Sequence, residues 1–426
     1  MKILIKNGYL VNPAGTVVEG RYDVLVENNI VSRIAKTIPA KKTKIIDAKD
    51  KYVFPGLIDV HCHLREPGRE DEETIQTGSV SAAAGGFTTV CCMPNTTPPL
   101  DNRVAVRFVI DRARDASCEV LPIGAITVNR EGRELPPYGE MVQEGAAGFS
   151  DDGDCVMNSL VMRRALEYSK LYRKPVISHS EDANLSRNGV MNEGALSTRM
   201  GLSGIPVQSE SIMVNRDVTL ARLTGGRLHL AHISAEESLD VVRRAKKSNE
   251  NITCEAAIHH LFLTEDAVKG YNTNAKMMPP LRTEKDVRAL LKGLKDGTID
   301  CMVTDHAPHS EEEKESGFEN APFGVIGFET ALSLAMELRK EGMTVRQIIA
   351  LLTAGPARVM GIDRGVVAEG KRADITVFDP DVEWVYSKEE IQSKSKNSPF
   401  IGRKMKGRVV TTIYRGRIVS ELISSR

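Results

Sequence analysis

The chain has 426 residues, with 57 basic and 57 acidic side chains and 41% hydrophobic residues. Its length allows more than one domain, although a barrel can reach this size as one unit. Because the formal net charge is +0, no long-range attraction draws the chain to nucleic acid or to an anionic membrane. No apolar run approaches the length of a membrane span. We therefore expect no nucleic-acid or membrane partner, and we expect individual side chains in a pocket to recognise any charged substrate.

The cysteines and the start of the chain point to the cell interior. MKILIKNGYLVN alternates short apolar and polar stretches and does not have the pattern of a signal peptide. The seven cysteines contain no CxxC pair, and an odd number in a chain of this size argues against a disulfide framework. We expect reduced thiols and a cytoplasmic location.

The two ends of the chain have the pattern of short strands. Segments such as ILIKNGYLV and YDVLVENNIVSRIA near the start, and RADITVFDP and VVTTIYRGRIVS near the end, alternate apolar and polar residues between turns. Neither end is large enough to fold alone. We therefore expect residues 1–54 and 365–426 to form one small, discontinuous β-sandwich domain.

The middle of the chain, residues 55–364, alternates short apolar runs with amphipathic segments of helical length, such as 156–172 and 234–248. This order is typical of β/α units with a parallel sheet. Eight such units predict an α/β fold of the (β/α)8 barrel type, with the active site at the C-terminal ends of the strands. The eight candidate strands are GLIDV, FTTVCCM, VLPIGAIT, AAGFS, PVISH, RLHLAHI, ITCEAAI and DCMVTD.

Polar residues that bind metals stand where these strands end. The nine histidines all lie between His61 and His309, so we expect the chemistry in the middle of the chain and not at its ends. A random distribution would place many of these residues on helices instead. The residues at strand ends are His61, His63, Asn95, Asp151, His179, His232, His259, His260 and Asp305.

The HxH pair predicts a metal site. Residues i and i+2 of a strand point to the same side, so His61 and His63 both face the mouth of the barrel. Two buried histidines that only make hydrogen bonds are the alternative, but further His and Asp at other strand ends favour a metal. His179, His232 and Asp305 are the natural additional ligands. Five ligands are too many for one tetrahedral zinc with a water, so we expect two metals and a bridging carboxylate from Asp151.

Several motifs resemble the cyclic amidohydrolases of the amidohydrolase superfamily, and among them the longer type of the dihydroorotase family. They are VFPGLIDVHCHLREPG, GGFTTVCCMPNT, FSDDG, ISHSED, HLAHIS and VTDHAPH, and the resemblance extends over essentially the whole chain. It implies a zinc-dependent enzyme of pyrimidine biosynthesis that reversibly closes N-carbamoyl-L-aspartate to dihydroorotate.

The resemblance also implies roles for individual residues. His61, His63 and Asp305 would hold one Zn²⁺, His179 and His232 a second, and Asp151 and a hydroxide would bridge the two ions. Asp305 would also be catalytic, moving a proton between the attacking water and the ring nitrogen.

The implied substrate carries a carboxylate, which suits the two-pronged donor of an arginine. The substrate-binding residues implied by the family are His63, Arg65, Asn95 and His309, with the backbone of Phe323 and Gly324 against the ring. The chain departs from the family at Met278, where an Asn is usual.

Two other functions compete with this interpretation. One is a hydantoinase-like or allantoinase-like hydrolase, but related enzymes of that kind use a carbamylated lysine as bridge, where FSDDG has an aspartate. The other is an inactive barrel that only scaffolds a partner, but such a chain would be expected to have lost metal ligands. The family also implies a homo-oligomer and an association with aspartate carbamoyltransferase, which supplies the substrate.

Overall fold

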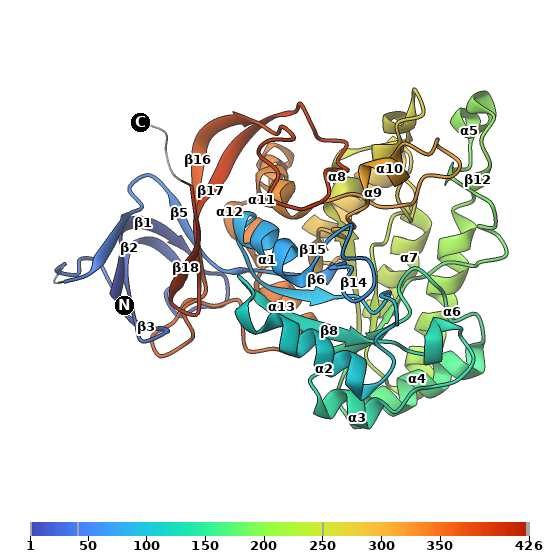
Figure 1. The fold of residues 1–426 in the computed structure, drawn as a ribbon, viewed down its shortest axis with the longest axis horizontal. Helices are drawn as coiled ribbons and strands as arrows, with labels where there is room; N and C mark the ends of the chain where they lie inside the picture. Colours follow the sequence, from blue (N-terminus) through green and yellow to red (C-terminus); the bar gives the residue numbers. More distant parts are fainter. Residues whose placement is uncertain (1, 41, 249–250, 423–426) are drawn as a thin grey trace.

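The computed structural model describes residues 2–40, 42–248 and 251–422. Its centre is a barrel of eight parallel strands in the spatial order β15-β14-β13-β10-β9-β8-β7-β6 (Figure 1). Each predicted strand overlaps one of them, so the predicted (β/α)8 barrel is confirmed. The strands are β6 (Leu57–Cys62), β7 (Phe87–Cys92), β8 (Glu119–Gly124), β9 (Gly148–Ser150), β10 (Val176–Ser178), β13 (Leu228–Leu230), β14 (Ile252–Ala257) and β15 (Cys301–Val303).

The barrel closes where the first strand meets the segment that follows the last one. The amide of Asp305 donates to the carbonyl of His61 at 3.1 Å, and the amide of His63 donates to the carbonyl of His306 at 2.8 Å. Cys62 and His306 form a parallel bridge. These hydrogen bonds lie at the C-terminal end of β6, so the closure brings the HxH pair directly beside Asp305.

Helices surround the barrel, and several of them bury one apolar side. In α9, for example, Val287, Leu290 and Leu294 are buried at helical spacing, and Thr283 and Asp286 form a capping box at its start. The predicted helical segments 156–172 and 234–248 correspond to α4 and α7. The helices are α1 (Ile75–Ala84), α2 (Arg103–Arg112), α3 (Tyr138–Gln143), α4 (Ser159–Leu171), α5 (Ala195–Met200), α6 (Gln208–Thr224), α7 (Glu236–Lys246), α8 (Ile258–Phe262), α9 (Glu284–Lys295), α10 (Glu311–Lys314), α11 (Phe328–Glu337), α12 (Val345–Ala350) and α13 (Ala354–Met360).

The two ends of the chain join in one eight-stranded sheet beside the barrel, with strands from both ends next to each other (Figure 1). The join is made by β5, which pairs with β1 on one side and with β16 on the other. Side chains from both ends share one buried apolar cluster, including Ile3, Val24, Ile375 and Ile413. The strands are β1 (Lys2–Val11), β2 (Glu19–Glu27), β3 (Ile30–Ala35), β4 (Lys44–Asp47), β5 (Tyr52–Pro55), β16 (Ile375–Val385), β17 (Lys404–Tyr414) and β18 (Arg417–Glu421).

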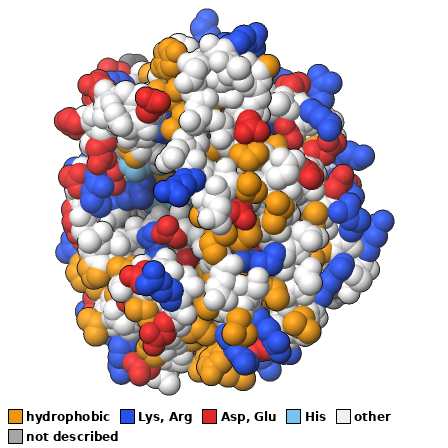
Figure 2. All heavy atoms as spheres, turned by 90° about the vertical axis from the view of Figure 1, so that its right-hand side faces the viewer, with side chains coloured by type: hydrophobic (Ala, Val, Ile, Leu, Met, Phe, Trp, Pro, Cys, Tyr) orange, Lys and Arg blue, Asp and Glu red, His pale blue; other side chains and the backbone are white. Residues whose placement is uncertain are grey.

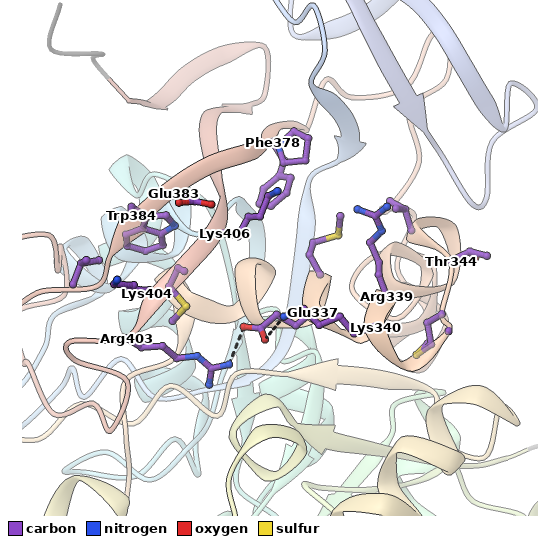
Figure 3. Close-up of a pocket in the computed structure, with 17 residues that line it drawn as sticks. Glu337, Arg339, Lys340, Thr344, Phe378, Glu383, Trp384, Arg403, Lys404 and Lys406 are labelled. Carbon is purple, nitrogen blue, oxygen red and sulfur yellow. Dashed lines mark hydrogen bonds and ion pairs between the residues drawn. The ribbon is translucent and has the colours of Figure 1, made fainter.

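A groove of about 1040 Å³ lies between strands β16 and β17 and the end of helix α11 (Figure 3). Trp384, Phe378, Arg403 and Lys406 are among its lining residues, and none of the predicted site residues lines it. Within the described residues, no helix is both long and apolar enough to cross a membrane. All seven cysteines are unpaired, as the sequence predicted.

Glu119 on β8 ties the base of the barrel to the segment that leads into β16. Its carboxylate accepts from Arg364 Nε at 2.8 Å and from Arg372 Nη1 at 2.9 Å. The side chain of Glu119 is only 13% exposed. Burial alone would raise the pKa of Glu119, but the two guanidinium groups outweigh it and lower the pKa to about 2.

We expect Glu119→Gln to lower the free energy of unfolding by up to about 3 kcal/mol at pH 7, because the pKa shift of the carboxyl is a stability term. The native pKa lies below the ordinary value of 4.5. The contribution is therefore complete above that value and fades as the pH falls toward about 2. Urea unfolding of wild type and variant at pH 7 and pH 3 measures the difference. The exposed Glu134→Gln is the control, and a difference between wild type and Glu119→Gln that does not shrink at pH 3 contradicts the prediction.

Candidate metal centre and active site

Four histidines and two aspartates meet at the C-terminal end of the barrel strands. His61 Nε2 and His63 Nε2 lie 3.6 and 3.1 Å from Asp305 Oδ1. His179 Nδ1 and His232 Nε2 lie 2.9 Å apart. The structure therefore brings together five of the six predicted metal ligands, which lie at the end of β6 or just after β6, β10, β13 and β15.

Asp152, and not Asp151, occupies the centre of this cluster. Its Oδ1 lies 3.1 Å from His61 Nε2 and 3.7 Å from both His179 Nδ1 and His232 Nε2. Its Oδ2 lies 3.6 Å from His63 Nε2. A single carboxylate thus faces all four histidines, which is the geometry that a bridging ligand between two metals needs.

The prediction of Asp151 as the bridge is therefore wrong in this structure. The Asp151 carboxylate accepts hydrogen bonds from the amides of Ile126 and Thr127 at 2.8 and 3.0 Å, and also from the Thr127 hydroxyl. Burial raises its pKa to about 6, opposed by these hydrogen bonds. The reason is strand alternation: Phe149 stacks on Tyr138 of α3 outside the barrel wall, so Asp151, two residues on, also faces outward.

The donor set fits divalent metal ions. His61 Nε2 and Asp152 Oδ1 are buried and face each other, yet neither has a hydrogen-bonding partner. Buried polar atoms without partners are rare and require an explanation, and imidazole and carboxylate are ordinary ligands of Zn²⁺. The ligand atoms of these residues form two groups, and within each group all atoms lie within 4.8 Å of one another. One group is His61, Asp152 and His232, and the other is His61, His63 and Asp305.

The far nitrogen of three of these histidines is fixed by an acceptor side chain. Glu255 Oε1 lies 2.6 Å from His61 Nδ1, Asn95 Oδ1 lies 2.8 Å from His63 Nδ1, and Glu181 Oε2 lies 3.0 Å from His179 Nε2. Such partners set the tautomer and the ring orientation of metal-binding histidines. Each ring consequently turns its other nitrogen toward the cluster.

Glu255 is a site residue that the sequence analysis missed. Besides His61, it contacts His229 Nε2 at 2.9 Å and accepts from the amide of His232 at 3.1 Å. Burial would raise its pKa, but His61 and His229 outweigh that effect and lower it to about 2. A charged residue inside the buried strand ITCEAA was the available signal, because such residues are almost never fully buried unless paired.

The predicted carboxylate-binding residues lie together beside the cluster. Arg65 Nη2 lies 3.0 Å from His309 Nε2, and Arg65 Nε donates to the carbonyl of Pro308 at 3.0 Å. The carbonyl of Phe323 lies 2.8 Å from His309 Nε2. Burial and the nearby Arg65 hold the pKa of His309 well below its usual range. Gly324 has φ +135, and a Cβ there would lie 2.7 Å from the Cβ of Ala307, so the segment needs glycine.

The way in is a recess at the barrel mouth. A cavity of about 420 Å³ is lined by Asn129, Arg130, Cys155, His179 and Glu181, and so reaches the cluster. A histidine is visible in a recess of the surface, among basic and acidic side chains that alternate over this face (Figure 2). Neither basic nor acidic side chains dominate this face (Figure 2), in agreement with the equal numbers of basic and acidic residues in the sequence.

A parallel barrel with an HxH pair on its first strand and His, His and Asp after later strands defines the chain as a metal-dependent amidohydrolase. Solved structures of related hydrolases have this fold. L-hydantoinase (dihydropyrimidinase) from Arthrobacter aurescens superposes with a TM-score of 0.88 at 24% identity, covering 98% of this chain and 96% of that one. D-hydantoinase (dihydropyrimidinase) from Thermus sp. gives 0.81 at 25%, covering 98% and 95%.

The sequence comparisons narrow the class to one family. The Dihydro-orotase-like family matches residues 50–238, and the Amidohydrolase family matches residues 326–420. The dihydroorotase of Endomicrobium trichonymphae is 50% identical over 93% of this chain and 94% of its own length. That of Caldicellulosiruptor saccharolyticus is 48% identical over 98% of both. The chain belongs to the dihydroorotase family of cyclic amide hydrolases.

Substituting the two neighbouring aspartates separates their roles. We expect Asp152→Asn to retain less than about half of the bound metal of the wild type, because the central carboxylate loses its charge. We expect Asp151→Asn to keep its metal but to lose about 1–3 kcal/mol of stability through the hydrogen bonds to Ile126 and Thr127. Metal analysis and thermal unfolding of both variants give the two readouts. Equal metal content in the wild type and Asp152→Asn would refute the placement of Asp152 as bridge.

Proposed function

We propose that the chain is a dihydroorotase that reversibly cyclises N-carbamoyl-L-aspartate to (S)-dihydroorotate and holds two Zn²⁺ ions. The observation that carries the proposal is that Arg65 and His309 lie 3.0 Å apart on the segments that follow β6 and β15, the same segments that carry His63 and Asp305 of the metal cluster. The pair offers a carboxylate site next to the place where a ring amide would be opened. Curated relatives named dihydroorotase, 44–50% identical over nearly the full chain, support the same activity.

In this proposal His61, His63 and Asp305 would hold one ion, His179 and His232 would hold the other, and Asp152, which faces all four histidines, would be a ligand shared between them. When bound, the ions would supply an activated water and would polarise the carbonyl that is attacked. The protein contributes orientation: Glu255, Asn95 and Glu181 keep the imidazoles turned inward.

Asp305 is placed to move the proton. Burial alone would raise its pKa, but His61 and His63 outweigh burial and hold the pKa of this carboxyl well below its usual range. It is therefore ionised and can accept a proton at a carboxylate oxygen. In ring opening Asp305 takes a proton from the attacking water and delivers it to the leaving ring nitrogen as the amide C–N bond breaks. In ring closure it removes the proton from the ureido nitrogen and returns it to the departing carboxylate oxygen, which leaves as water.

The ring itself is held by polar groups of the chain. Arg65 offers a planar pair of N–H donors to the carboxylate of dihydroorotate. Asn95 and His309 lie on the loops after β7 and β15, on either side of the loop that carries Arg65. The backbone at Phe323 and Gly324 lies against His309. A hydantoin or allantoin ring lacks this carboxylate, so the Arg65 and His309 pair favours dihydroorotate over those substrates.

Zinc content and dihydroorotate ring opening, measured on one preparation, test the proposal. We expect about two Zn²⁺ per chain and a turnover that is lost on chelation and restored by added Zn²⁺. We expect Asp305→Asn to lower kcat by roughly 10²- to 10⁴-fold, the usual range for losing a general acid–base group. A zinc-loaded wild type that opens hydantoin or allantoin but not dihydroorotate would replace the proposal with the competing hydrolase function.

A further inference from the structure

A buried carboxylate lies behind the substrate-binding pair. Glu72 stands on the loop between β6 and α1, and its side chain is 1% exposed. Glu72 Oε1 lies 2.7 Å from His309 Nδ1, and Glu72 Oε2 lies 3.2 Å from Arg65 Nε. Each carboxylate oxygen therefore holds a different member of the pair, one from the loop after β6 and one from the loop after β15.

The contacts determine how both side chains face the site. Because His309 Nδ1 points to Glu72, its Nε2 points the other way, toward Arg65 Nη2 and the carbonyl of Phe323. Because the Nε edge of Arg65 is held by Glu72 and the carbonyl of Pro308, its terminal nitrogens face away from Glu72, and one of them, Nη2, lies 3.0 Å from His309 Nε2. Arg65 also has φ 60, a strained backbone conformation that surrounding contacts must maintain.

Glu72 is itself fixed from the surface side. Arg69 Nη2 lies 3.2 Å from Glu72 Oε1 and 2.6 Å from Glu313 Oε1, and the hydroxyl of Ser395 donates to the carbonyl of Glu72 at 2.7 Å. Glu72, His309 and Glu313 are close enough to suggest a second cation site. The guanidinium groups of Arg65 and Arg69 already neutralise these acids, so the cluster does not need a bound cation.

We propose that Glu72 is a positioning residue of the substrate-carboxylate site, which holds Arg65 and His309 in the arrangement that receives the carboxylate of the ring. The inference rests on the proposed function and goes beyond it, because it assigns the affinity for the carboxylate to a residue that does not touch the substrate. We expect Glu72 to affect substrate binding and not the chemical step, since Glu72 contacts none of the six residues of the metal cluster.

The test compares Glu72→Gln with Asp71→Asn in the zinc-loaded enzyme. Gln keeps the shape of the side chain but loses the charge and one acceptor. Asp71 is the neighbouring acid on the same loop, is 62% exposed and contacts Arg69, so its variant removes the same charge without touching the pair. We expect Glu72→Gln to raise KM for dihydroorotate at least about tenfold with kcat within about threefold, and Asp71→Asn to leave both within about twofold.

A double-variant cycle separates positioning from general damage. In a background of Arg65→Met, we expect Glu72→Gln to lower kcat/KM by about threefold or less, because one of the two side chains that it orients is already gone. Zinc content and melting temperature of all variants are recorded, and Glu72→Asp, which keeps the charge, should recover part of the lost affinity if a Gln variant folds poorly.

Three results overturn the inference. The first is an unchanged KM in Glu72→Gln, and the second is a full tenfold loss in the Arg65→Met background as well. The third is a lower KM, which would show that Glu72 competes with the substrate for Arg65. A zinc-loaded wild type that neither binds nor opens dihydroorotate in a calorimetric titration and an activity assay would instead overturn the proposed function, and the inference with it.

Discussion

The closure of the barrel between β6 and the segment after β15 is the constraint on which the site depends. The hydrogen bonds between Asp305 and His61 and between His63 and His306 fix the first and last strands in register. Without this register the HxH pair and Asp305 would belong to opposite edges of an open sheet. With it, ligands separated by more than 240 positions in the chain lie 3.1 Å apart.

Much of this arrangement could be predicted from the sequence, because the ends of the strands can be recognised from the sequence pattern. Apolar runs of five to eight residues identified all eight strands. The His, Asp or Asn at the ends of seven of them identified the end of the barrel where the chemistry lies. The same reasoning predicted that both ends of the chain join in one small β-sandwich domain, since neither could bury its apolar face alone. The two ends do join, and their strands form one eight-stranded sheet. These inferences needed only the period of the pattern and the packing rule for parallel strands.

The wrong choice of bridging aspartate came from the alternation of side chains along a strand, which decides which of two neighbouring residues faces inward. FSDDG offers two aspartates, and only the outward stacking of Phe149 on Tyr138 decides that Asp152 faces the cluster. That contact joins β9 to α3, and no local pattern reveals it. His232 shows the opposite case: His229 faces inward to Glu255, so strict alternation would turn His232 outward. Its φ of 28 breaks the alternation and returns the ring to the site.

The buried carboxylates could not be assigned from the sequence for a related reason. Glu255 and Glu72 act through partners on other strands and loops, so their roles exist only after folding. An acid within an apolar strand signals that a partner is needed, but it does not say which one. Glu255 serves His61, His229 and the backbone of His232, whereas Glu72 serves Arg65 and His309.

The buried carboxylates also help to hold strained backbone conformations at the site. Arg65, His232 and Asp305 all have positive φ, at 60, 28 and 47, a conformation that costs a non-glycine residue on the order of 1–3 kcal/mol. Each is held by other groups: Arg65 by Glu72 and Pro308, His232 by Glu255, and Asp305 by the closure bond to His61. Glycine would relieve the strain at any of the three positions but would remove the side chain that the site needs. The surrounding barrel therefore stabilises conformations that are unfavourable in isolation, and the binding of metal and substrate depends on that support.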